Sequence, residues 1–107
     1  KVTEDVIFDV ASYAKPKEVA QMLAHAVKGE FPKARDFLIK IMLEYGLSGL
    51  DVVKQVQQEC WKVAGIPDRQ KLELVKLCGE AEFRMVEGAD EVVQLEAMLA
   101  GMGIVKG

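Results

Sequence analysis

Residues 79–100 decide how this chain is expected to fold, and they read GEAEFRMVEGADEVVQLEAMLA. Apolar residues at helical spacing lead up to Gly88, which suits the left-handed position that ends many helices. Asp90 then suits the N-cap of a following helix. The stretch therefore predicts the end of one helix, a glycine turn and the start of another. Gly79 lies within the first helix, where glycine costs about 1 kcal/mol relative to alanine, so we expect another helix to cross closely there.

The rest of the chain continues the helical pattern on the N-terminal side of this stretch. Period-two alternation is never long enough to predict a sheet. We expect an all-α fold, a compact bundle of five main helices with a short extra N-terminal helix or turn over residues 3–11. Ser48, with Asp51 three residues later, favours a capping box. The five main helices are expected over residues 16–28, 31–45, 48–64, 67–87 and 90–102.

The composition is that of one globular domain. The chain has 107 residues, of which 50% are hydrophobic and 29% charged, enough to bury a core without disulfides or a metal. We expect residues 1–15 to be a lead-in from a preceding domain, 16–100 the helical domain, and 101–107 a flexible tail. Because the chain begins with Lys1 rather than methionine, the sequence suggests an excised piece of a longer protein.

Charge and hydropathy disfavour two classes of partner. The net charge of −3 disfavours a surface that neutralises nucleic-acid phosphates, and no apolar run approaches the length of a membrane span. Residues 79–100 hold six acids against one base. This acidic bias fits a solvated face with favourable charge at a helix N-terminus, or a surface that attracts a basic partner.

Side chains that could carry chemistry are few. His25 is the only histidine and has no assignable orienting partner, and Glu80 and Glu82 are two apart, so they point to different helix faces. Cys60 and Cys78 lack metal-ligand spacing, so buried free thiols are expected, with a disulfide between neighbouring helices as the alternative. The sequence therefore predicts no catalytic residues, no cofactor-binding residues and no metal site.

Excess apolar surface is the stronger functional signal. The expected helices over 31–45 and 67–87 each carry a second apolar line beside the main stripe. A five-helix domain has too few elements to cover every line, so the remaining surface could meet another subunit. Trp61 is either a core or domain-edge residue, or an anchor of such an interface.

Several short motifs resemble one family, the C-terminal collar domain of the replication factor C small subunit, the sliding-clamp loader of archaea and eukaryotes. The resemblance covers about residues 3–100, and the archaeal form fits better. Ala81 and Glu82 are mild departures from the family pattern. The motifs that carry the resemblance lie at residues 16–19, 29–31, 34–35, 43–49, 51–55, 66–67, 79–80, 83–84, 87–89 and 94–95.

The resemblance implies a role in DNA replication. In that family an AAA+ ATPase module and a lid precede the collar, and collars pack side by side into a ring. The ATPase modules load the sliding clamp onto primed DNA. This chain would be the oligomerisation domain and not itself an enzyme. ATP and Mg²⁺ would belong to the full-length family protein, and the clamp and primed DNA would be contacted only through absent domains. The location would be cytoplasmic, or nuclear in a eukaryote.

Our candidates for the subunit interface are Trp61, Phe83, Arg84, Glu87 and Gln94. The other interpretation of Arg84 and Glu87 is an ion pair within one helix, at positions i and i+3. The alternative function for the chain is a helical protein–protein interaction module that binds a peptide or partner helix. A small helical enzyme is disfavoured by the lone histidine and the absent motifs.

Overall fold

The computed structural model describes residues 13–105, and within that range every regular element is an α-helix. The predicted all-α bundle of five helices is therefore confirmed. The expected helix or turn over residues 3–11, and most of the expected lead-in, lie outside the described residues. The helices are α2 (Pro16–Val27), α3 (Phe31–Tyr45), α4 (Gly49–Cys60), α5 (Asp68–Val86) and α6 (Glu91–Ile104).

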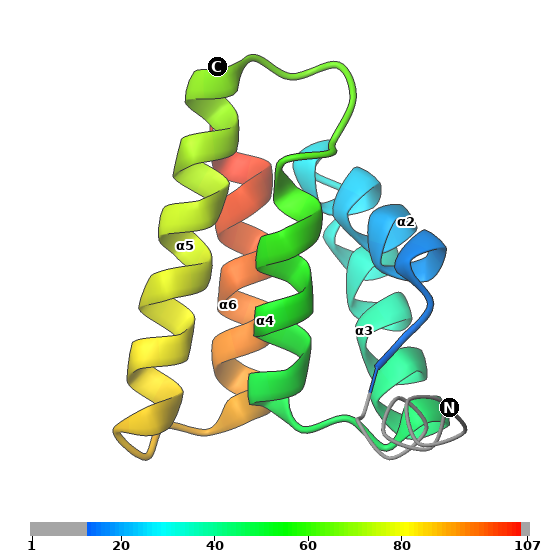
Figure 1. Ribbon diagram of the computed structural model, residues 1–107, viewed down its shortest axis with the longest axis vertical. Helices are drawn as coiled ribbons and strands as arrows, with labels where there is room; N and C mark the ends of the chain where they lie inside the picture. Colours follow the sequence, from blue (N-terminus) through cyan, green and yellow to red (C-terminus); the bar gives the residue numbers. More distant parts are fainter. Residues whose placement is uncertain (1–12, 106–107) are drawn as a thin grey trace, which may run out of the picture.

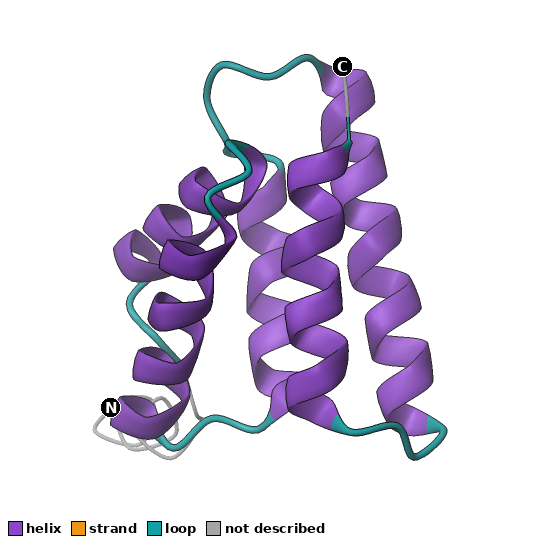
Figure 2. Ribbon diagram, turned by 180° about the vertical axis from the view of Figure 1, so that it is seen from behind, coloured by secondary structure: helices purple, strands orange, loops and turns teal. Residues whose placement is uncertain are grey.

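The helices form two groups (Figure 1). α4, α5 and α6 run side by side, and the α2–α3 hairpin packs against one side of them. The view from behind shows the same division, with the α3–α4 and α5–α6 connections at one end and the long α4–α5 loop at the other (Figure 2). α5 packs chiefly against α4 and α6, which leaves its remaining surface at the edge of the bundle.

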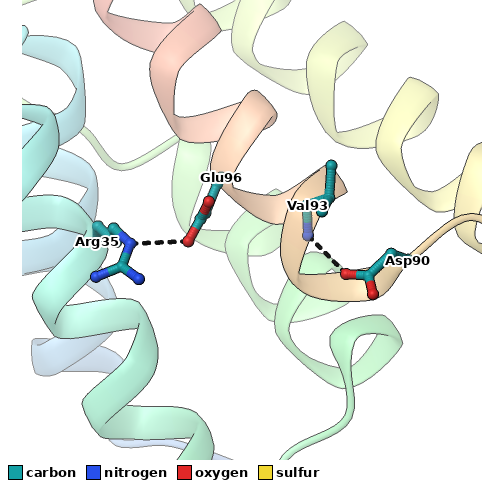
Figure 3. A network of polar contacts seen from close by, with 4 residues as sticks. All are labelled: Arg35, Asp90, Val93 and Glu96. Atoms are coloured by element: carbon teal, nitrogen blue, oxygen red, sulfur yellow. Dashed lines mark hydrogen bonds and ion pairs between the residues drawn. The ribbon is translucent and has the colours of Figure 1, made fainter.

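Local sequence sets the helix starts as expected. The Asp51 N–H donates to the Ser48 hydroxyl at 3.1 Å, and the Ser48 N–H donates to the Asp51 carboxylate at 3.0 Å, so the predicted capping box is confirmed. At the start of α6 the Asp90 carboxylate accepts from the Val93 N–H at 2.9 Å (Figure 3). Gly88 precedes this cap with φ +107°, a value that favours glycine.

The core lies where the two groups of helices meet. Its largest fully buried side chains include Leu23 from α2, Leu38 from α3, Leu74 from α5, and Leu95 and Met102 from α6. Their burial is the main stabilising contribution to this fold, because each removes a full apolar side chain from water.

Polar contacts at the edge of the core also join the two groups. At the surface the Arg35 guanidinium of α3 lies 2.8 Å from the Glu96 carboxylate of α6 (Figure 3). The buried Gln55 side chain holds the backbone of Ala14, accepting from its N–H at 3.0 Å and donating to its carbonyl at 2.6 Å. This pair of bonds fixes the entry to α2 on the α4 surface.

The third helix ends earlier than its apolar spacing predicts. α4 stops at Cys60, whereas the stripe suggested continuation to Ala64. The reason is backbone hydrogen bonding: Lys62 donates to the carbonyl three residues earlier, at 3.0 Å, and Val63 does the same at 3.4 Å. This tightening ends the α-helix, and Gly65 with φ +82° completes the change of direction.

The expected close crossing at Gly79 is wrong. A Cβ added there would meet nothing within 4 Å, so within residues 13–105 no helix crosses at that point. The close approach occurs at Gly49, where a Cβ would lie 2.7 Å from the Glu91 Cβ and 2.9 Å from the Met85 sulfur. The Gly49 N–H also donates to the Glu91 carboxylate at 2.8 Å, so this glycine joins the starts of α4 and α6.

The C-terminal helix runs further than expected. The sequence predicted a flexible tail from residue 101, but α6 continues to Ile104 and Met102 is fully buried. Gly103 does not loosen this end, because its backbone packs tightly against the end of α2. A Cβ there would lie 2.9 Å from both the Ala26 carbonyl oxygen and the Gly29 Cα. Residues 101–104 therefore belong to the bundle.

Candidate subunit interface

The outer surface of α5 carries a continuous apolar line, which we call the α5 stripe: Leu72, Val75, Gly79, Phe83 and Val86. Successive spacings of three or four residues place all five positions on one helix face. Leu72, Phe83 and Val86 are 57%, 64% and 61% exposed, and Val75 is half-buried. At 1.5 Å per residue the stripe is about 21 Å long.

The stripe is exposed because α5 lies at the edge of the bundle. Its opposite face turns Leu74, Cys78, Ala81 and Met85 into the core, so the helix is apolar on both sides as expected. Isolated exposed apolar side chains are ordinary, but a line of them along one helix is typical of an interaction surface. The exposed acid Glu87 follows directly after the stripe.

A groove of about 270 Å³ lies beside the stripe, between α4 and α5. Gly79 forms part of its wall, and the absence of a side chain at this position leaves the groove open. Because glycine is unfavourable inside a helix, its presence here fits a need for close approach from outside the chain. The groove is lined by Val53, Lys54, Gln57, Val75, Cys78, Gly79 and Glu82.

The structure brings four of the five predicted interface residues to one end of α5. Phe83 lies on the stripe, and Glu87 follows the last turn of α5, where its N–H donates to the Phe83 carbonyl at 3.1 Å. Arg84 and Gln94 line a small hollow of about 50 Å³ between α5 and α6. Trp61 is separate: it begins the α4–α5 loop, is 48% exposed, and lies toward the opposite end of α5.

The ion pair between Arg84 and Glu87, which the sequence left open as an alternative, is not seen in this conformation. Among the ion pairs of residues 13–105, none joins Arg84 to Glu87. Both residues are exposed, and Glu87 lies just beyond the last helical residue of α5. Their side chains are therefore available at the surface next to Phe83.

A second hollow lies between α2 and the end of α4. It has a volume of about 380 Å³ and a wall of mostly small apolar side chains with two lysines. The sequence did not predict it, because its two walls come from segments far apart in the chain. We call it the α2–α4 hollow, and it is lined by Ala20, Ala24, Val27, Lys28, Glu59, Lys62, Val63 and Ala64.

His25 and Glu30 form a contact between titratable side chains near the α2–α3 connection. The His25 ring lies 2.7 Å from the Glu30 carboxylate and stacks on Phe37. The hydrogen bond to His25 holds the pKa of Glu30 below its ordinary value of 4.5.

Across residues 13–105 no group of three or more His, Cys, Asp or Glu side chains is placed to hold a metal ion. In the same range no helix has both the length and the apolar character needed to cross a bilayer.

Comparison with known proteins gives one consistent result. Residues 14–101 match the family model of the replication factor C C-terminal domain. Three similar proteins are replication factor C small subunits, from Staphylothermus marinus (46% identical over 101 residues), Sulfolobus acidocaldarius (44% over 105) and Methanopyrus kandleri (43% over 100). In that order the alignments cover 94%, 97% and 94% of this chain but 31%, 32% and 16% of those proteins. This chain, which spans about a third or less of the length of these relatives, belongs to the replication factor C C-terminal domain family.

Proposed function

We propose that this chain is the oligomerisation domain, or collar, of a clamp-loader subunit. It joins subunits into a ring, so that AAA+ modules elsewhere in the full-length protein can load the sliding clamp onto primed DNA in the cytoplasm. In this proposal ATP, Mg²⁺, the clamp and DNA are bound by those other domains. The observation that carries the proposal is the α5 stripe, an exposed apolar line on an edge helix of a domain from a clamp-loader family.

A ring of like subunits needs two different faces on each copy, because a surface that pairs only with itself stops at a dimer. The α5 stripe supplies an exposed apolar face, in which Phe83 is the most exposed side chain. The α2–α4 hollow is a suitable second face, because it is concave and lined by small side chains such as Ala24. We propose that the stripe of one subunit packs into the hollow of the next.

Charge supports this pairing. Glu82 and Glu87 border the stripe, whereas Lys28 borders the hollow; Lys62 also borders the hollow but is paired there with Glu59 at 3.5 Å. Complementary charge at the rim of an interface mainly sets orientation and association rate. The alternative, a module that takes a foreign peptide in the α4–α5 groove, does not use the hollow and is less consistent with the family match.

The first experiment compares two substitutions of the same kind. Phe83→Glu places a carboxylate on the stripe, and Leu43→Glu places one on α3, where Leu43 is 79% exposed. Both changes leave the core intact, so circular dichroism should report the same fold. In sedimentation velocity the chain with Phe83→Glu should remain monomeric at concentrations where the unaltered chain and the Leu43→Glu control associate. Equal association of the two variants would contradict the proposal.

A mixing experiment tests the head-to-tail arrangement. The Phe83→Glu chain keeps an intact hollow, and an Ala24→Glu chain keeps an intact stripe. Each variant alone should be monomeric, but an equimolar mixture should form a one-to-one dimer that grows no further. A stripe that pairs with another stripe instead predicts that the Ala24→Glu chain associates by itself, and that result would exclude the proposed second face.

A further inference from the structure

Two buried cysteines from different helices lie against each other. Cys60 ends α4 and Cys78 lies in the middle of α5, and their side chains are 0% and 2% exposed. Their sulfur atoms are 3.8 Å apart, in hydrogen-bonding contact. A disulfide brings the sulfurs to about 2.05 Å, so bond formation requires a closure of roughly 1.8 Å by side-chain rotation and small helix shifts.

We propose that Cys60 and Cys78 are a reversible oxidation site, which a hydroperoxide converts into a disulfide that ties α4 to α5. Neither sulfur belongs to the α5 stripe, but Cys78 lines the groove beside it, so the oxidation is proposed for the monomer. The proposal rests on the contact between two thiols whose helices are otherwise joined only by packing and by the loop over residues 61–67.

Small oxidants have a route to this pair. Cys78 lines the α4–α5 groove, which has a volume of about 270 Å³. The neighbouring Gly79 leaves that wall open, because a Cβ there would meet nothing within 4 Å. Hydrogen peroxide is far smaller than this groove, whereas larger disulfide oxidants would have to displace the helices. The geometry therefore favours peroxide as the reagent.

The reaction balances with peroxide alone. One cysteine, as thiolate, attacks a peroxide oxygen, the O–O bond breaks, and hydroxide leaves and takes up a proton, which gives a sulfenic acid and water. The second sulfur attacks the sulfenic sulfur, the S–S bond forms, and the S–O bond breaks to release a second water. Two thiols are oxidised by two electrons in total, and one peroxide is reduced. The hydrogen bond between the sulfurs lowers the pKa of Cys60 and raises the pKa of Cys78, so Cys60 is the first thiolate, and peroxide has to pass Cys78 at the groove wall to reach it.

The disulfide should stabilise the domain measurably. It would close a loop from residue 60 to residue 78, and this lowers the conformational entropy of the unfolded chain more than that of the folded chain. For a loop of this length, chain-entropy estimates correspond to a gain of about a hundredfold in the folding equilibrium constant. In a domain of this size the midpoint of thermal unfolding should rise by roughly 10–20 °C.

The test treats the folded chain with hydrogen peroxide, at a concentration where it is monomeric, and measures its intact mass under non-reducing conditions. The expected product is a monomer that has lost two hydrogens, gives one linked peptide containing both cysteines, and melts at a higher temperature until dithiothreitol is added. The matched controls are Cys60→Ala and Cys78→Ala, each compared with its own untreated sample. Neither control should gain thermal stability on oxidation.

Three results would overturn the proposal. The first is a folded chain that keeps both thiols after peroxide treatment, while the urea-unfolded chain loses them. The second is formation of disulfide-linked dimers instead of the intramolecular bond. The third is a disulfide-containing monomer whose thermal unfolding midpoint is unchanged or lower, which would mean that α4 and α5 must move apart from their observed packing.

Discussion

Gly79 and Gly103 both lie inside helices, yet the same substitution to alanine should have opposite effects at the two positions. A Cβ at Gly79 would meet nothing within 4 Å. A Cβ at Gly103 would lie 2.9 Å from the Ala26 carbonyl oxygen and 2.9 Å from the Gly29 Cα. Both neighbours are backbone atoms, so they cannot rotate away as a flexible side chain would.

The expected magnitudes follow from these surroundings. Gly79→Ala removes the backbone entropy cost of glycine within a helix and should raise the free energy of unfolding by about 1 kcal/mol. Gly103→Ala gains less, because Gly103 is next to the last residue of α6. It also forces α6 away from α2, and overpacking of this kind typically costs about 1–3 kcal/mol. The net expectation is a loss of about 1–2 kcal/mol.

The assay is urea unfolding followed by circular dichroism, at protein concentrations low enough to avoid association, which would add apparent stability. The slope of the free energy against urea should be unchanged in both variants. Each 1 kcal/mol should appear as a shift of about 4–8 °C in Tm. The reasoning is refuted if Gly79→Ala destabilises the chain, or if Gly103→Ala stabilises it as much as Gly79→Ala does.

The Gly79 substitution also separates stability from assembly. If a neighbouring subunit approaches the α5 stripe closely, the added methyl group should weaken association although it strengthens the fold. Ordinary overpacking at a contact costs about 1–3 kcal/mol, which corresponds to an increase of about 5-fold to 150-fold in the dissociation constant. A Gly79→Ala chain that is more stable and associates equally well would show that Gly79 is not in close contact with the neighbouring subunit.

Three further substitutions test particular contacts. Gln55→Ala removes both hydrogen bonds to the Ala14 backbone, at 3.0 and 2.6 Å, and should cost about 2 kcal/mol in urea unfolding. Met102→Ala should lower the free energy of unfolding by about 2–5 kcal/mol, because Met102 is fully buried. An effect near zero would mean that residues 101–104 are not part of the packed bundle. Tyr45 donates a 2.8 Å hydrogen bond to Glu18, which raises the pKa of Tyr45 from 10.0 to about 12. Stability from this pair should be complete below pH 10 and lost as the pH rises toward 12, so Tyr45→Phe should abolish that alkaline loss.

Much of the fold could be predicted from local sequence, because its signals are local. The apolar periodicity placed α2 and α3 to within a residue or two, and the Ser48–Asp51 pair marked the start of α4. The end of α4 could not be predicted in the same way. Val63 continues the apolar spacing and is partly buried, but it is reached through turns rather than a helix.

The candidate interface was likewise predictable from the sequence only where it depends on local spacing. The spacing that favours a second apolar surface on α5 also placed Phe83 and its neighbours on it. Spacing alone does not say whether Gly79 meets a helix of the same chain or faces outward, because both arrangements need a small residue. The α2–α4 hollow had no sequence signal, since its walls come from residues 20–28 and 59–64, which only the tertiary fold brings together. Trp61 was a candidate because tryptophan is enriched at interface hot spots, and the fold places it toward the end of α5 opposite to Phe83.

The most direct test of the central claim, that α5 carries one face of a ring-closing interface, is the mass of the unaltered chain in native mass spectrometry over a range of concentrations. A closed ring stops growing when its last interface forms. We expect a single discrete assembly of several copies that replaces the monomer as concentration rises and then stays constant in mass. A chain that remains monomeric at its highest soluble concentration, or that forms a ladder of ever larger species, would contradict the account.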